Sequence, residues 1–139
     1  MTMTKQDIRS SFYEGNTKII RVTIRDAEGN LKPLENCEIT YVITDRTNYD
    51  IIILRKQKKA FDPIDGDQIK VVGEGLCDIH INPPDTVRKF GTYRHHLNIV
   101  DENNKESTAF TGLVTIHQAP ARRYRANTAN AYLFGEHLD

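Results

Sequence analysis

The 139-residue chain lacks tryptophan, has only two cysteines, and carries no excess of either charge. Its 19 Lys and Arg residues match 19 Asp and Glu residues, so we do not expect it to bind nucleic acid or an anionic membrane as a whole. No apolar run approaches the roughly 20 residues that span a bilayer. The N-terminal residues MTMTKQDIRSS contain no apolar core of a secretion signal, so we expect synthesis in the cytoplasm.

Metal-binding patterns are also missing from the sequence. Cys37 and Cys77 form no CxxC motif, and no nearby histidine pair completes a zinc pattern, so we expect buried free thiols, although a disulfide is possible. His95 and His96 are adjacent on an expected strand and would point to opposite faces, which prevents them from binding one metal ion. We expect no metal and no cofactor.

Catalytic motifs are equally scarce. Three aspartates surround Gly66, but their spacing does not fit a calcium-binding loop, and a solvated turn explains them better. These are Asp62, Asp65 and Asp67. None of the three serines lies in a GxSxG motif, and there is no glycine-rich phosphate loop. We therefore expect a protein that is not an enzyme.

What the sequence does contain is a repeated alternation of apolar and polar residues with the period of a β-strand. Turn signals separate the segments, and no convincing amphipathic helix is present. This pattern is typical of an all-β fold, and we predict an immunoglobulin-like antiparallel β-sandwich of about seven strands, although small barrels and jelly rolls fit nearly as well. The predicted strands are 17–25, 36–44, 51–54, 68–72, 76–81, 91–100 and 108–117.

The turn that contains Asp85 leads to the longest predicted strand. Gly91 opens this strand and Tyr93 follows two residues later, which is where sandwich folds place a tyrosine corner, a hydroxyl bonded to backbone upstream. The alternative is that Tyr93 is simply another core aromatic residue. Alternation predicts that His95 faces the interior and His96 the solvent. Antibody domains have cysteine at the position of His95, so this is not an antibody-type domain.

We divide the chain into an N-terminal arm or short edge segment (1–16), a sandwich domain (17–118) and a C-terminal arm (119–139). The C-terminal arm either folds back as an extra strand or docks on a neighbouring subunit. The continuous apolar run 51–54 predicts a strand covered on both faces, by the core or by a partner. The basic run 55–59 is expected to be a solvated link or to form subunit salt bridges. The candidate assembly interface consists of Ile51, Ile53, Arg122, Arg123, Tyr124, Arg125, Tyr132, Leu133 and Phe134.

Several short motifs carry a resemblance to a known family. Gly-Asn-Thr precedes the first strand, Asp85-Thr86 forms the turn, and Gly91-Thr92-Tyr93 begins the long strand. The last strand contains Thr111-Gly112 followed by alternating apolar residues. Over residues 13–118 the chain resembles the immunoglobulin-like domains of tailed-bacteriophage structural proteins, and the N-terminal domain of baseplate upper proteins in particular.

The resemblance implies a virion protein, made in the host cytoplasm, whose partners are other virion proteins or copies of itself in a homo-oligomer. In that family the domain anchors a longer fibre or receptor-binding part, whereas here only the C-terminal arm follows. The departure favours a compact component of the baseplate or tail, a connector or a head-decorating protein. The alternative function is a module that binds carbohydrate or a host surface, although sugar-binding platforms commonly use the tryptophan that this chain lacks.

Overall fold

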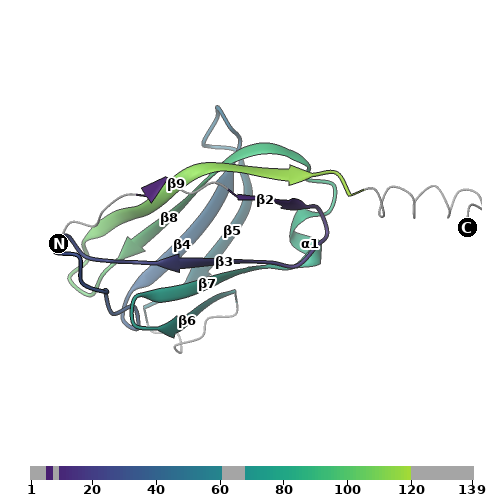
Figure 1. Ribbon diagram of the computed structural model, residues 1–139. Helices are drawn as coiled ribbons and strands as arrows, with labels where there is room; N and C mark the ends of the chain where they lie inside the picture. The colour runs from purple at the N-terminus through teal and green to yellow at the C-terminus, as the bar shows by residue number, and fades with distance from the viewer. Residues whose placement is uncertain (1–5, 8–9, 61–67, 120–139) are drawn as a thin grey trace, which may run out of the picture.

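The computed structural model describes residues 6–7, 10–60 and 68–119, which form two β-sheets around a common core (Figure 1). The larger sheet has the order β1-β9-β8-β4-β5, with β2 also paired to β9, and the smaller sheet has the order β3-β7-β6. The strands of the larger sheet are β1 (Gln6–Asp7), β2 (Ser10–Tyr13), β4 (Glu38–Thr44), β5 (Ile52–Lys58), β8 (Gly91–Val100) and β9 (Glu106–His117). Those of the smaller sheet are β3 (Lys18–Thr23), β6 (Ile69–Gly73) and β7 (Leu76–Ile81).

The strand order confirms the predicted immunoglobulin-like sandwich. In that fold one sheet contains strands B, E and D and the other contains C, F and G. Here β3, β7 and β6 take the places of B, E and D, while β4, β8 and β9 take those of C, F and G, with β5 added beside β4. The strand pairs within this framework are antiparallel.

The N-terminal segment adds a strand position that the sequence pattern did not predict. Both β1 and β2 pair in parallel with β9, β1 at Phe110 and Thr111 and β2 from Val114 to His117. Phe12 of β2 is buried in the core. Residues 10–13, within the range assigned to an N-terminal arm, therefore form part of the larger sheet.

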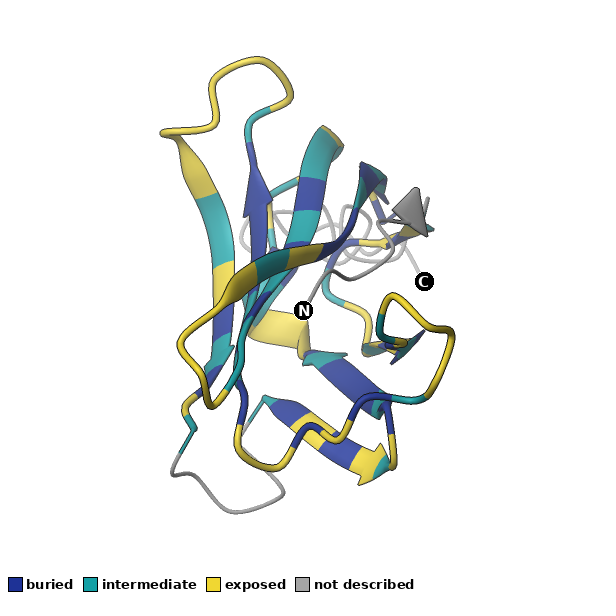
Figure 2. Cartoon of the chain, turned by 90° about the vertical axis from the view of Figure 1, so that its left-hand side faces the viewer, coloured by how far each residue is buried: buried dark blue, intermediate teal, exposed yellow. Residues whose placement is uncertain are grey.

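The core follows from the period-2 alternation, because every second side chain of a strand faces the opposite sheet. Buried and exposed residues accordingly alternate along the ribbons (Figure 2). Near the centre, Tyr41, His95 and Phe110 lie in contact, with ring centroids 5.0 to 6.1 Å apart. These residues come from β4, β8 and β9, and they join the three central strands of the larger sheet through one cluster.

Strand β5 differs most from the sequence-based prediction. The strand continues to Lys58, and its burial pattern places Lys56 and Lys58 in the interior, with 2% and 0% of their surface exposed. The prediction of a solvated basic link is therefore wrong at these two positions. Ile51 and Ile52 are exposed, so the core of the same chain does not cover them, and of the two predicted alternatives only cover by a partner is left for these residues. Long aliphatic stems allow lysines to lie against apolar surface while their ammonium groups find polar partners at the edge.

A one-turn helix, α1 (Pro83–Thr86), connects β7 to β8 where a turn was predicted. Prolines fit the first positions of a helix because the N–H groups there have no partner within the helix. The Asp85 carboxylate accepts the backbone N–H of Asn82 at 2.7 Å and the Nζ of Lys56 at 2.6 Å. Asp85 therefore holds the start of the helix and neutralises a buried lysine on β5.

Candidate assembly surface at one end of the sandwich

One end of the sandwich gathers segments that lie far apart in the sequence. Strand β2 ends at this end, where Tyr13 pairs with His117, and β8 begins there, where Gly91 pairs with Ile116. The loop between β4 and β5 lies at the same end of the sheet, since Thr44 pairs with both Arg94 and Ile52. We call this end the α1 end (Figure 1). It is formed by residues 13–19, 45–52, 82–90 and 117–119.

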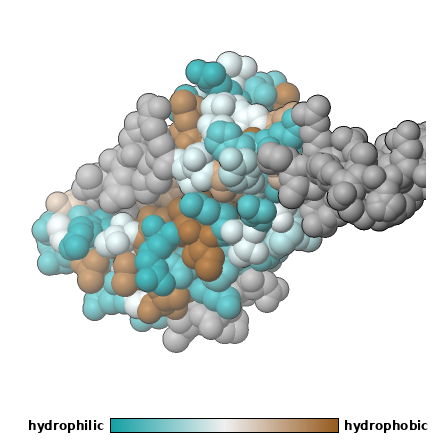
Figure 3. All heavy atoms as spheres, turned by 45° about the vertical axis from the view of Figure 1, so that its right-hand side comes forward, coloured by the Kyte–Doolittle hydropathy of each residue, from teal (hydrophilic) through white to brown (hydrophobic). Residues whose placement is uncertain are grey.

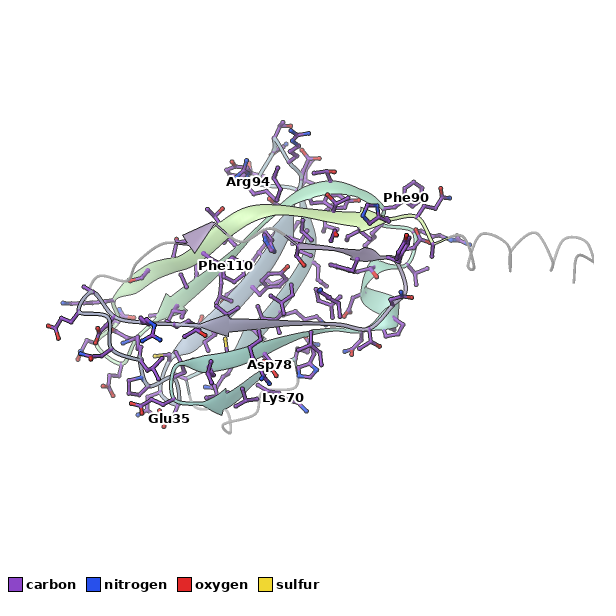
Figure 4. The ribbon with its side chains drawn as sticks, viewed as in Figure 1. Glu35, Lys70, Asp78, Phe90, Arg94 and Phe110 are labelled. Atoms are coloured by element: carbon purple, nitrogen blue, oxygen red, sulfur yellow. The ribbon has the colours of Figure 1, made fainter. Side chains whose placement is uncertain are left out.

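Exposed apolar side chains are concentrated at the α1 end. Seven large hydrophobic residues are exposed within the described part of the chain, and only Val72 lies toward the opposite end. The other six are Tyr13, Ile19, Tyr49, Ile51, Ile52 and Phe90. The space-filling view shows hydrophobic atoms open to solvent among hydrophilic ones over one face of the molecule (Figure 3), and Phe90 lies where β9 ends (Figure 4).

Four of these residues form what we call the end patch: Tyr49, Ile51, Ile52 and Phe90. The segment before β8 lies next to the start of β5, because the Nζ of Lys89 donates to the carbonyl of Ile53 at 3.1 Å. The Tyr93 hydroxyl donates to the carbonyl of Phe90, and the Asp45 carboxylate is near enough to help burial raise the pKa of Tyr93. The loop and the segment before β8 therefore lie close together.

The loop that carries Tyr49 and Ile51 is held by its own polar groups. The Asp45 carboxylate accepts hydrogen bonds from the backbone N–H groups of Asn48 and Thr47 and from the Thr47 hydroxyl, at 3.0 to 3.1 Å. These bonds lower the pKa of Asp45. The Tyr49 ring packs against the Arg94 guanidinium at 5.7 Å. The apolar side chains are therefore held at the surface by an ordered loop.

The tyrosine-corner prediction has a mixed outcome. The Tyr93 hydroxyl does bond to backbone three residues upstream, with 3.1 Å between it and the Phe90 carbonyl oxygen. Gly91 has a φ of 145°, a backbone conformation that residues with a side chain rarely adopt, so glycine is favoured there even though an added Cβ would make only ordinary contact with the Tyr93 ring and hydroxyl, at 3.4 Å. Asp85 takes no part in the corner, since its carboxylate contacts Asn82 and Lys56.

Replacing Tyr93 by phenylalanine should lower the free energy of unfolding by about 0.5–1 kcal/mol, because an exposed hydrogen bond contributes less than a buried one. The ring still packs against the core, so its apolar contacts are retained. Urea unfolding of the wild type and the Tyr93→Phe variant measures the difference. Equal stability of the two proteins would show that the hydroxyl bond does not lock the corner.

The two histidines are divided between the faces of the sheet, as predicted. His95 is fully buried, and its Nδ1 lies 2.8 Å from the Tyr41 hydroxyl. His96 is half-buried, not solvated as predicted, and burial lowers its pKa. Cys37 and Cys77 are buried free thiols, which confirms that prediction. Burial raises the pKa of both, that of Cys77 to about 12, so neither is a ready nucleophile.

The predicted interface residues are only partly placed by the structure. Ile51 is exposed in the end patch, whereas Ile53 is half-buried and packs against the core. The other predicted positions, Arg122, Arg123, Tyr124, Arg125, Tyr132, Leu133 and Phe134, lie outside the described residues. The sequence analysis missed Tyr49 and Phe90, which lie in turns where alternation gives no signal. The loop 61–67, with its three aspartates, also lies outside the described residues.

A polar pocket of about 320 Å³ lies at the opposite end of the sandwich, lined in part by Glu38 and Asp101. Both carboxylates already have structural partners: Glu38 accepts from the Gln57 side chain, and Asp101 accepts the backbone N–H groups of Asn103 and Lys105. These loop bonds, with desolvation opposing them, keep the pKa of Asp101 low. Two of the carboxylates that line the pocket are therefore already engaged within the fold.

Comparisons with known proteins add no family to these observations. No protein family matches the sequence, and no curated protein is significantly similar to it. Among the described residues, no three His, Cys, Asp or Glu side chains are grouped so that they could hold a metal ion. The described part of the chain also contains no helix long and apolar enough to cross a membrane.

Proposed function

We propose that this protein is a non-enzymatic structural component of a tailed-phage virion, where it serves in the baseplate or tail, as a connector, or as a head-decorating protein. It assembles with copies of itself or with other virion proteins. The observation that carries the proposal is the location of the end patch, at the end of the sandwich from which the C-terminal arm departs. The motifs that resemble phage sandwich domains support the particle assignment.

The size of the end patch supports an assembly role. Four large side chains, each about half-exposed, present on the order of 400 Å² to solvent, taking ~200 Å² for a large side chain. Patches of this size on a soluble protein commonly mark an interaction site. A loop that is fixed by Asp45 presents two of these side chains, so little ordering entropy opposes binding.

The β5 edge of the larger sheet is protected against pairing with another strand. Strand β5 is an edge of the larger sheet, and it directs Lys56 and Lys58 toward the interior. Inward-pointing charges are a known protection against edge-to-edge pairing, because a slipped or added strand would leave them unpartnered. Assembly through the α1 end and the C-terminal arm is therefore favoured over extension of the sheet at β5.

Removal of residues 120–139 should prevent incorporation into particles and leave the sandwich folded, because every described strand lies before residue 118. The full-length and truncated proteins are expressed in cells that produce the phage with its own gene inactivated. Purified particles are then probed with an antibody against residues 10–119. Circular dichroism of the isolated truncated protein checks that its β-structure is retained.

Normal incorporation of the truncated protein would show that the C-terminal arm is dispensable for assembly. Absence of the full-length protein from purified particles, when it is abundant in the lysate, would contradict the proposed function itself. Incorporation of the full-length protein alone is the expected result.

A further inference from the structure

We infer that the end patch binds a second copy of this chain, and that residues 120–139 of each copy complete the contact. The inference rests on the proposed function and specifies its partner. Of the described surface, the α1 end holds six of the seven exposed large hydrophobic side chains. The chain has no net charge, so two copies do not repel each other at neutral pH.

The area of the end patch indicates why the arm is needed. A stable protein–protein interface covers roughly 800 Å² on each partner. The four residues of the end patch supply on the order of 400 Å² of that area. The arm brings the apolar sequence Tyr132-Leu133-Phe134, whose three side chains add on the order of 600 Å² at ~200 Å² each. The patch and one arm together therefore reach the area that a standard interface covers on each partner.

The point of departure of the arm allows it to cross to the second copy. His117 ends β9 at the α1 end: its carbonyl accepts the N–H of Glu14 and its ring packs near Tyr13. Tyr132 lies 13 residues beyond Ala119, a distance of up to about 45 Å in an extended chain. The five strand positions of the larger sheet span only about 19 Å. A two-fold arrangement of α1 ends therefore lets each arm reach the other sandwich.

An unpartnered acidic group lies beside the same point. Glu14 is only 4% exposed, and its Oε2 is buried without a hydrogen-bond partner. A buried carboxylate is stabilised when a cation reaches it. The arm supplies three guanidinium groups within six residues of Ala119: Arg122, Arg123 and Arg125. The three arginines of the arm thus carry the charge opposite to that of the Glu14 carboxylate.

The test introduces lysine at two positions that are similarly exposed and lie at opposite ends of the sandwich. Ile52 in the end patch is 55% exposed, and Val72 at the opposite end is 45% exposed. Full-length wild type, Ile52→Lys and Val72→Lys are analysed by sedimentation equilibrium over a range of concentrations. We expect the wild type and Val72→Lys to form dimers with similar Kd, and Ile52→Lys to weaken dimerisation by about tenfold or more. Circular dichroism confirms that all three are folded.

A wild type that stays monomeric at every concentration would overturn the inference, as would equal weakening by the two lysines. Truncation at residue 119 should weaken dimerisation; stronger association would mean that the arm covers the patch of its own copy, which also overturns the inference. Failure of the proposed function looks different. If the chain is found in particles yet is monomeric in solution, the virion role stands and the self-contact is wrong. If the chain dimerises but is absent from particles, the self-contact stands and the virion role is wrong.

Discussion

Replacing Asp85 by alanine is expected to lower the free energy of unfolding by about 3–5 kcal/mol, because the substitution leaves a buried ammonium group without its counter-charge. Lys56 is 2% exposed, and its Nζ lies 2.6 Å from Oδ2 of Asp85. The same carboxylate accepts the N–H of Asn82 at the start of α1. Its removal therefore unsettles both the interior of β5 and the helix that leads to β8.

Denaturant unfolding of a small set of variants separates these contributions. Lys56→Met keeps most of the side-chain volume and removes the charge, so it should cost less than Asp85→Ala. In the double variant, Asp85→Ala should add little to Lys56→Met, since the charge that needed Asp85 is gone. Asp85→Ala being no more costly than Lys56→Met would show that the ion pair is not what stabilises this end of β5.

The Arg21–Asp78 pair is the natural contrast. Its hydrogen bonds are 2.8 and 2.9 Å long, and they hold the pKa of Asp78 below its usual value. The Arg21 side chain, however, is 64% exposed. Water solvates an exposed guanidinium whether or not the pair forms, so Asp78→Ala, which leaves only Arg21 behind, should cost far less than Asp85→Ala, which leaves the buried Lys56 behind. The comparison separates burial of charge from the presence of an ion pair.

Strand β5 also shows why the sequence predicted the fold better than its details. Period-2 alternation is a local property, and it located seven of the strands that the structure contains. The burial of Lys56 and Lys58 depends on distant partners: Asp85 lies 29 residues away, and the carbonyls that Lys58 binds include that of Glu35. Because lysine is almost never fully buried without such partners, a reading of β5 alone assigns both residues to solvent.

The α1 end was hidden from sequence analysis for a related reason. Tyr49 and Phe90 lie in turns, 41 positions apart, and only the pairing of β4 with β8 brings their segments to one end. Ile52 belonged to an apolar run that was expected to be covered by the core or by a partner, but β5 is an edge strand and its start projects beyond the core. Exposure at an edge is set by topology, which no local pattern contains.

Phe110 provides the second large expected effect, at the centre of the core. The ring is fully buried on β9, with its centroid 5.0 Å from that of His95 and 6.1 Å from that of Tyr41. Replacing Phe110 by alanine removes these contacts and leaves a cavity, which should cost about 3–5 kcal/mol. Urea unfolding measures this loss. The midpoint should fall, while the m-value, the slope of the unfolding free energy against urea concentration, should stay the same.

Two control variants, one on the outer face of β9 and one at Phe110 itself, test whether the loss comes from the contacts of the Phe110 ring with Tyr41 and His95. Leu113 lies three residues further along β9 on the outer face, where it is half-buried, so Leu113→Ala should cost about 1 kcal/mol or less. Phe110→Leu keeps most of the volume and should lie between the two. Equal losses for Phe110→Ala and Leu113→Ala would place the main core contacts elsewhere. The expected order instead means that the Phe110 ring, which packs beside the buried 2.8 Å Tyr41–His95 hydrogen bond, makes the main core contacts of β9; this hydrogen bond joins β4 to β8, whereas the antibody disulfide joins the strands equivalent to β3 and β8.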